Sequence, residues 1–230
     1  MKLDVHVLRV FTDENAQHGN ELAVVSDAAG LTADQGVALT NRLGFSESVF
    51  VDDPARAEIR IFTGTQEIAL AGHPAVGTAW ALGQAAGSVP VALRPRLAAE
   101  LPAWSEDGLT WISGAVADAI EWDLVEVDSP AAVDEQPQAP RPPAPGRYMY
   151  WSWIDRRAGL VRARCFAPAW GVGEDEATGS AAIHLTDRLG RELTIRQGRG
   201  SVLRAKPAEV PGRVDLGGRV VSDGMRSVEL

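Results

Sequence analysis

Glu47 has the surroundings of a residue that can both take and return a proton. It lies in Ser46-Glu47-Ser48, directly before the apolar run Val49-Phe50-Val51. A carboxyl beside small polar residues and an apolar strand loses part of its hydration, and this loss raises its pKa towards neutrality. Such a carboxyl can act in turn as general base and general acid. The alternative is an ordinary strand residue that faces solvent, and the spacing alone leaves both interpretations open.

His73 stands between Gly72 and Pro74, where a helix is expected to begin. An imidazole in this position can donate a hydrogen bond to a ligand or move a proton, because its pKa is near neutral. It can equally serve only to cap the helix. The other histidines are scattered, and no HExxH or HxH pair is present, so the sequence gives no support for metal catalysis.

Asp175 belongs to an acidic cluster, Glu174-Asp175-Glu176, just before Thr178-Gly179-Ser180. Acidic residues before a helix often interact only with the helix dipole. The functional alternative is that Asp175 holds an amine or hydroxyl of a substrate while the amides of Gly179 and Ser180 hold its carboxylate. A helix N-terminus favours an anion because its first amides have no partner within the helix.

The segments that position these side chains follow a strand–turn–helix pattern that occurs twice. In the first copy, Glu58–Phe62 alternates like a half-buried strand, and Ala75–Ala86 is predicted as a helix between a proline and a glycine. In the second copy, Arg164-Cys165-Phe166 repeats Arg60-Ile61-Phe62, and another apolar helix opens near Ala177. We interpret the two copies as an internal duplication with two anion-binding helix ends.

Size and composition are those of an ordinary globular protein. The chain has 230 residues, 45% hydrophobic and 23% charged, which is enough for one large or two small domains. It has no long uncharged apolar run and no segment like a signal peptide, so we expect a cytoplasmic location and no membrane partner. The net charge of −9, with no basic run, argues against nucleic acid as a partner but allows a small anionic substrate at a local site.

One cysteine and two lysines limit the chemistry further. Cys165 alone can form neither an intramolecular disulfide nor a cysteine-based zinc site, and its place in an expected strand favours a buried structural role. Lys2 and Lys206 lie outside any motif, so Schiff-base chemistry with pyridoxal phosphate is not expected.

Short strands dominate the rest of the chain. Leu31–Leu43 is predicted as a helix capped by Thr32. Residues 131–146 contain five prolines and are predicted to be a loop. Gly217-Gly218, between two short strand-like segments, predicts a hairpin. The predicted fold class is therefore α+β with a mainly antiparallel sheet.

At these residues the sequence resembles the PhzF family of phenazine-biosynthesis-type isomerases, which share the diaminopimelate epimerase fold. The matching segments occur in family order and span nearly the whole chain, and this ordered set is more specific than any one segment. They are Val10-Phe11-Thr12-Asp13, Gly19-Asn20, Leu22–Val25, Phe45–Val51, Arg60–Thr63, Glu67, Ala71–Ala79, Phe166–Pro168, Glu174–Ala181 and Gln197-Gly198.

The resemblance implies a fold of two pseudo-symmetric lobes, each a curved, mainly antiparallel sheet around a central helix, with the site in the cleft between the helix N-termini. We predict an N-terminal lobe over residues 1–116 and a C-terminal lobe over residues 117–230, which includes the proline-rich loop. The family also implies an enzyme of a biosynthetic process that often forms a homodimer.

The chemistry that the resemblance implies is cofactor-independent and metal-free. An isomerase of this type shifts a proton between carbons of a small unsaturated or amino-substituted carboxylic acid. By motif position, Glu47 would be the general acid/base, with His73 and Asp175 as its catalytic partners. The residues that would hold the substrate are Gly72, Gly179 and Ser180.

Several residues depart from the family pattern. Ala71 and Ala177 stand where epimerases of this fold have two opposed cysteines, so racemisation by two thiols cannot operate here. Glu21 and Glu176 replace common prolines, and His18 stands where an aromatic residue is usual.

The chain is also shorter than typical members, around residues 115–150, where the proline-rich loop replaces a strand–helix segment. This change trims the second lobe. It motivates the alternative hypothesis of a non-catalytic metabolite-binding or interaction protein on the same fold.

Overall fold

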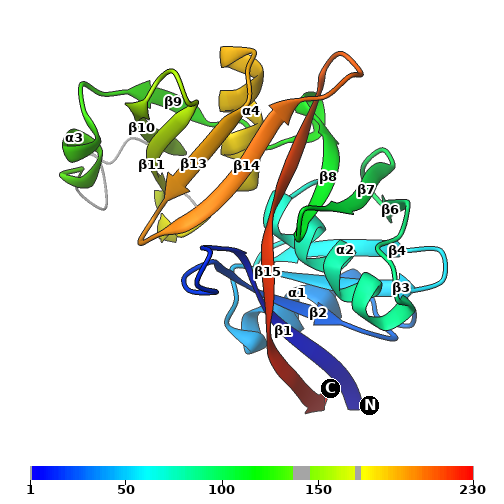
Figure 1. The fold of residues 1–230 in the computed structure, drawn as a ribbon. Helices are drawn as coiled ribbons and strands as arrows, with labels where there is room; N and C mark the ends of the chain where they lie inside the picture. Colours follow the sequence, from blue (N-terminus) through cyan, green and yellow to red (C-terminus); the bar gives the residue numbers. More distant parts are fainter. Residues whose placement is uncertain (1, 137–145, 169–171, 230) are drawn as a thin grey trace.

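The computed structural model describes residues 2–136, 146–168 and 172–229, which form two halves joined by one long strand (Figure 1). The N-terminal half contains β1 (Lys2–Thr12), β2 (Asn20–Val25), α1 (Ala33–Leu43), β3 (Glu47–Asp53), β4 (Glu58–Thr63), β5 (Glu67–Ile68), α2 (Gly72–Ala86), β6 (Ala92–Pro95), β7 (Leu101–Glu106) and β8 (Leu109–Ala115). The C-terminal half contains η1 (Val116–Asp118), β9 (Asp123–Glu126), α3 (Pro130–Asp134), β10 (Tyr148–Asp155), β11 (Leu160–Ala167), β12 (Val172–Asp175), α4 (Gly179–Leu189), β13 (Leu193–Gln197) and β14 (Ser201–Pro207). The joining strand is β15 (Arg213–Glu229).

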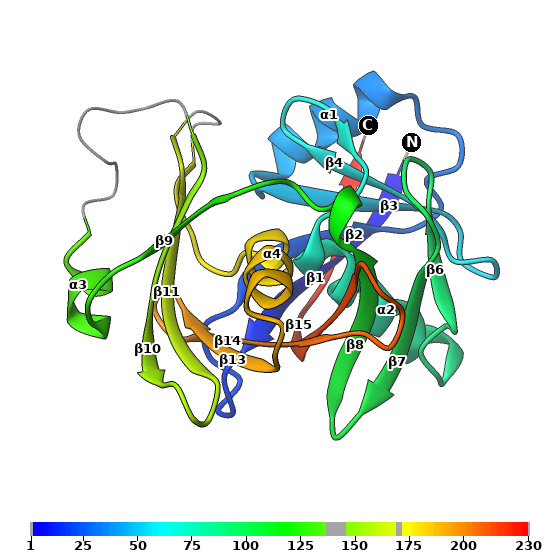
Figure 2. The same cartoon turned by 90° about the horizontal axis from the view of Figure 1, so that it is seen from above.

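The sheet of the N-terminal half closes on itself around α2. Strand pairing runs through β1, β2, β3, β4, β6, β7, β8 and β15, and β15 returns to pair with β1. Helix α2 lies inside this circuit (Figure 2). It carries no charged residue in its first or last turn, and most of its residues are buried, as expected for a helix that is covered on all sides.

The C-terminal half repeats the plan with an open sheet. Strands β14, β13, β11, β10 and β9 curve around α4 (Figure 2). The apolar side chains Ala181, Ala182, Ile183 and Leu185 of α4 are completely buried. The predicted α+β fold with one central helix in each curved sheet is therefore confirmed.

Two arginines show that the duplication extends to side-chain contacts. Arg60 on β4 forms an ion pair with Asp52 at 2.7 Å, and its guanidinium lies 5.6 Å from the centre of the phenylalanine ring two residues later. Arg164 on β11 does the same with Glu174, at 2.7 Å, and lies 4.9 Å from the corresponding ring. The arginine of the repeated triplet thus makes the same two kinds of contact in both halves.

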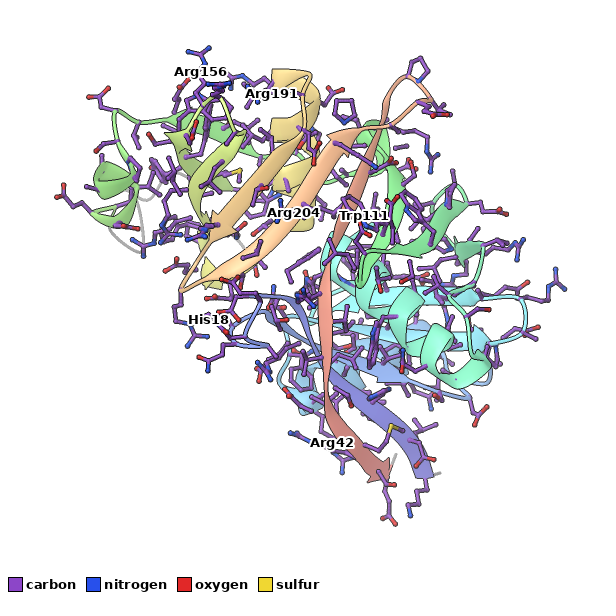
Figure 3. The ribbon with its side chains drawn as sticks, viewed as in Figure 1. His18, Arg42, Trp111, Arg156, Arg191 and Arg204 are labelled. Carbon is purple, nitrogen blue, oxygen red and sulfur yellow. The ribbon has the colours of Figure 1, made fainter. Side chains whose placement is uncertain are left out.

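The predicted hairpin at Gly217-Gly218 is wrong. Strand β15 passes through both glycines as one strand of 17 residues, and neither has a left-handed backbone. These glycines are required for space, because a Cβ on Gly217 would lie 2.3 Å from the Trp111 ring, and one on Gly218 would lie 2.4 Å from Phe11. Figure 3 shows Trp111 beside β15. A glycine pair that usually marks a turn here marks close packing of two aromatic rings.

Helix boundaries were predicted more reliably than loops. Thr32 caps α1 as predicted, through a reciprocal pair of hydrogen bonds with Gln35. The predicted loop over 131–146 is wrong at its start, since Pro130–Asp134 forms the short helix α3, capped by Ser129. Residues 137–145 of that loop lie outside the described residues. Among the helices that the structure describes, none is long and apolar enough to cross a membrane. The lobe boundary near residue 116 stays a prediction.

Candidate active site

The N-termini of α2 and α4 meet at two glycines. A Cβ on Gly72 would lie 2.6 Å from the Cα atom of Gly179, and a Cβ on Gly179 would lie 2.6 Å from that of Gly72. The residues that precede the two helices, Ala71 and Thr178, make no side-chain capping hydrogen bond to them. The unpaired amides of both first turns therefore lie close together, and this arrangement favours an anion.

A cavity of about 40 Å³, the inner cavity, lies at this junction. Both halves contribute to its lining, through β3, α2, β12 and α4. The structure brings all six predicted site residues to it: Glu47, Gly72, His73, Asp175, Gly179 and Ser180. Their proximity is an observation, whereas their individual roles stay predictions.

Glu47 is the first residue of β3, and its side chain is 20% exposed. Its Oε2 atom lies 3.7 Å from Nε2 of His73. Burial raises the pKa of the Glu47 carboxyl, and a hydrogen bond with Ser46 opposes that rise. A carboxyl in this position differs from an ordinary strand residue that faces solvent, because burial disfavours its charged form.

His73 lies in the first turn of α2 with its side chain almost completely buried. Burial lowers its pKa to about 4, although the charge of Asp175 and a hydrogen bond to the Glu21 backbone act in the opposite direction. The imidazole is therefore neutral at neutral pH. It does not cap the helix, and its Nε2 atom has no hydrogen-bond partner in the described part of the chain. This nitrogen thus lies near the Glu47 carboxyl with its hydrogen-bonding capacity unused among the described residues.

Asp175 is held by two donors that sequence reasoning did not assign to the site. Nδ2 of Asn20 donates to Oδ1 at 2.6 Å, and the Thr178 hydroxyl donates to Oδ2 at 2.6 Å. Gln197 supports the same turn by donating to the Asp175 carbonyl at 2.9 Å. Burial and the charge of Glu47 raise the pKa of Asp175 to about 6. Asn20, Thr178 and Gln197 all lie in the segments that resemble the family, but no local pattern indicated that they would converge.

The stability of an Asp175→Asn variant, relative to wild type, should increase as pH rises. The folded protein raises the carboxyl pKa from 3.8 to about 6, so its contribution to stability is lost as pH increases through this interval. The free energy of unfolding of the variant, relative to wild type, should increase by on the order of 2 kcal/mol between about pH 4 and about pH 7.5. Urea unfolding at both pH values measures this difference, and a pH-independent difference would contradict the prediction.

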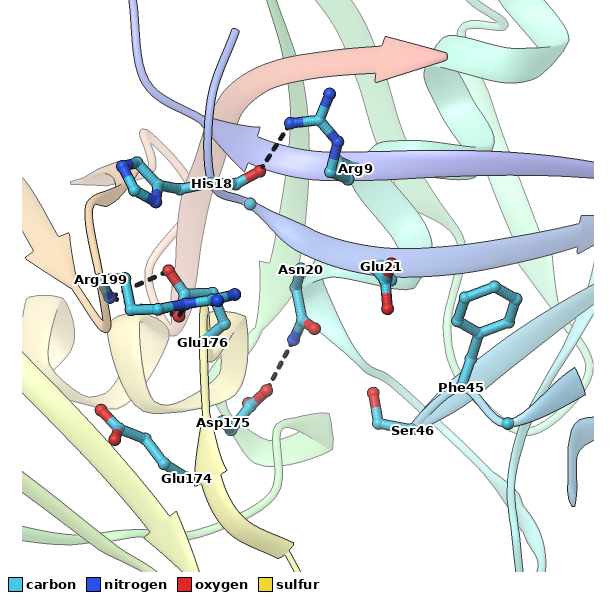
Figure 4. Close-up of a pocket in the computed structure, with 12 residues that line it drawn as sticks. Arg9, His18, Asn20, Glu21, Phe45, Ser46, Glu174, Asp175, Glu176 and Arg199 are labelled. Atoms are coloured by element: carbon cyan, nitrogen blue, oxygen red, sulfur yellow. Dashed lines mark hydrogen bonds and ion pairs between the residues drawn. The ribbon is translucent and has the colours of Figure 1, made fainter. Parts of the chain in front are cut away.

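A second, larger cavity adjoins the first at Ser46 and Asp175, which line both. This outer cavity has a volume of about 460 Å³, and Figure 4 shows the residues around it. Its lining carries four acidic side chains and two arginines: Glu21, Glu174, Asp175, Glu176, Arg9 and Arg199.

Three departures from the family pattern, His18, Glu21 and Glu176, lie at this outer cavity. The Glu176 carboxylate accepts hydrogen bonds from the Ser201 hydroxyl at 2.9 Å and from the Arg199 amide at 3.0 Å. The Ser201 oxygen in turn accepts from the Gly19 amide at 2.9 Å. Glu176 therefore connects the C-terminal half with the loop that leads to Asn20.

Comparisons with known proteins identify related chains. The family model PhzC-PhzF, "Phenazine biosynthesis-like protein", matches residues 8–141. The trans-2,3-dihydro-3-hydroxyanthranilate isomerase of Pseudomonas fluorescens is 31% identical over 92% of this chain and 94% of its own length. The enzyme of the same name from Pseudomonas aeruginosa is 29% identical over 94% of this chain and 92% of its own.

Solved structures show the same fold at low sequence identity. A PhzF family protein of Enterococcus faecalis superposes with a TM-score of 0.79 at 18% identity, with both chains covered completely. A hydroxyproline epimerase from Agrobacterium vitis gives a TM-score of 0.60 at 14% identity and covers 100% of this chain and 93% of its own. The family match and the full-length relatives together show that this chain belongs to the PhzC-PhzF family of phenazine biosynthesis-like proteins.

Proposed function

We propose that this protein is a cofactor-independent isomerase that moves a proton between two carbons of a small unsaturated or amino-substituted carboxylic acid. The isomerase class follows from the family and from relatives named for that activity. One observation supports the proposed proton transfer: Glu47, His73 and Asp175 line the same small cavity where two helix N-termini meet. Acidic and basic side chains in such a cavity have what proton transfer requires.

In the proposed reaction, Glu47 is the group that carries the proton. Its carboxylate removes a proton from one carbon of the acid, and the electron pair left behind moves along the conjugated bonds. The same carboxyl then returns the proton to another carbon, so no atom is gained or lost. Burial raises the pKa of Glu47, and a carboxyl with a raised pKa is better suited to return the proton that it has taken.

The substrate carboxylate is proposed to lie on the amides of Gly72, Gly179 and Ser180. Negative charge that spreads into the carboxylate during proton transfer would be stabilised there by the two helix N-termini. Asp175 would hold an amine or hydroxyl of the substrate. Because the inner cavity has only about 40 Å³, the remainder of the substrate would extend past Ser46 and Asp175 into the outer cavity.

Deuterium incorporation tests this proposal. The purified protein is incubated in heavy water with trans-2,3-dihydro-3-hydroxyanthranilate and, separately, with a set of other small unsaturated and amino acids. We expect deuterium at a single carbon of at least one acid, together with a shifted double bond. If none of these acids exchanges although some of them raise the melting temperature, the chain is a binding protein and the proposal is wrong.

A further inference from the structure

Trp122 lines two cavities, the inner cavity and a third one. It lies in the short connection between η1 and β9. It lines the inner cavity together with Ile120, and it also lines a cavity of about 560 Å³ with His184 and Arg188. Trp122 is thus shared by the linings of a small cavity at the helix N-termini and of a much larger one.

The indole also makes a directed contact with a predicted substrate-binding residue. Nε1 of Trp122 donates to Oγ of Ser180 at 2.9 Å. An indole nitrogen can only donate, so this bond occupies a lone pair of the hydroxyl and leaves the hydroxyl hydrogen available. Within the described residues, Ser180 Oγ makes no second side-chain hydrogen bond. The free hydrogen can therefore be donated to a ligand at the α4 N-terminus.

The backbone on both sides of Trp122 is tied to the helix that carries Ser180. Nε2 of His184 lies 3.2 Å from the carbonyl oxygen of Ala119, and Arg188 donates to the carbonyl of Leu124 at 3.2 Å. Both side chains belong to α4. These two contacts hold the connection that carries Trp122 against α4. Because Ser180 belongs to the same helix, they also fix the position of the indole relative to Ser180.

We propose that Trp122 is a positioning and specificity-determining residue of the site. Its N–H directs the Ser180 hydroxyl towards the substrate carboxylate, and its ring closes the inner cavity on the carboxylate side. This inference rests on the proposed function for the identity of the anion, a small carboxylic acid. The ring therefore sets how large an acid can be next to its carboxyl group.

Two substitutions separate the two roles. Trp122→Phe keeps an aromatic wall and removes the donor, whereas Trp122→Ala removes both. The probes are anthranilate and the larger 3-amino-2-naphthoate, with binding measured by calorimetry. We expect Trp122→Phe to weaken anthranilate binding by about 5-fold, the effect of one lost hydrogen bond, and to keep wild-type selectivity. We expect Trp122→Ala to shift the ratio of the two affinities towards the naphthoate by about 10-fold.

A double-mutant comparison shows whether Trp122 acts through Ser180. In a Ser180→Ala background, Trp122→Phe should cause no further loss of affinity, because the hydroxyl that it orients is gone. With a substrate that turns over, Trp122→Phe should raise KM and leave kcat nearly unchanged. Trp153→Phe is the matched control, since Trp153 lies on β10 against Arg156 and Arg191 and lines neither cavity.

The outcomes distinguish this inference from the proposed function. Additive effects of Trp122→Phe and Ser180→Ala, or unchanged selectivity in Trp122→Ala, would overturn the inference even if the protein isomerises an acid. Conversely, non-additive effects and altered selectivity in a protein without deuterium exchange would support the inference as a statement about carboxylate binding and refute the proposed reaction.

Discussion

Glu47→Gln is expected to lower kcat for proton transfer by about 10³-fold, the usual contribution of a positioned general acid/base. The amide keeps the size of the side chain but can neither take nor return the proton. The dissociation constant of a carboxylate ligand should change little, because Glu47 is not among the residues proposed to hold the carboxylate. Deuterium exchange measured by NMR gives the rate, and calorimetry with anthranilate gives the affinity.

Glu58→Gln provides the control for this experiment. Glu58 lies on the neighbouring strand β4, and its side chain is 40% exposed in an ion pair with the exposed Arg56. Its substitution should leave both the exchange rate and the affinity at wild-type values. If Glu47→Gln exchanges deuterium at close to the wild-type rate, the acid/base role belongs to another residue, and His73 and Asp175 would be the next to test.

Gly72→Ala is expected to destabilise the protein by about 3 kcal/mol, at the upper end of the range for overpacking. A methyl group on Gly72 would lie 2.6 Å from the Cα atom of Gly179 and equally close to Leu216. Because one of these neighbours is backbone, the strain can be relieved only if α2 and α4 move apart. That movement would also separate the amides that are proposed to bind the carboxylate, so anthranilate binding should be lost.

A substitution on the other helix and a control show whether the loss comes from the contact between α2 and α4. Gly179→Ala meets the same contact from the other helix and should give similar losses. Gly30→Ala should have almost no effect, since no atom lies within 4 Å of its added Cβ and its backbone is not left-handed. Urea unfolding and calorimetry on the three variants provide the measurements. Near wild-type stability in Gly72→Ala would show that the helix contact is looser than described.

Local signals in the sequence are enough to predict the three longer helices, α1, α2 and α4, but not the short helix α3. Thr32 before α1, and the glycines that follow α2 and α4, end or begin helices through contacts within a few residues. The same signals failed at Gly217-Gly218, because the need for glycine there comes from rings that lie far away in the chain. Local chemistry cannot distinguish a glycine needed for a turn from one needed for space.

In the candidate site, too, some residues are predictable from the sequence and others are not. Glu47, His73 and Asp175 were identified by their types and neighbours and by resemblance to a family, and the structure brings them together. Trp122 was not identified, because a tryptophan in a short connection has no distinctive local pattern. Its contact with Ser180 joins residues that are 58 positions apart, and only the folded chain reveals it.

Strand β15 delays the completion of the N-terminal sheet during synthesis, because it lies far from its partner β1 in the sequence. Strand β1 is made first, yet its pairing with β15 runs from Lys2 opposite Glu229 to Thr12 opposite Arg219. Until those residues have left the ribosome, the sheet around α2 remains open along one edge of β1. Such distant pairing slows folding, because a long loop must close before the contact can form. The sheet around α2 is therefore expected to close only after β15 has been synthesised.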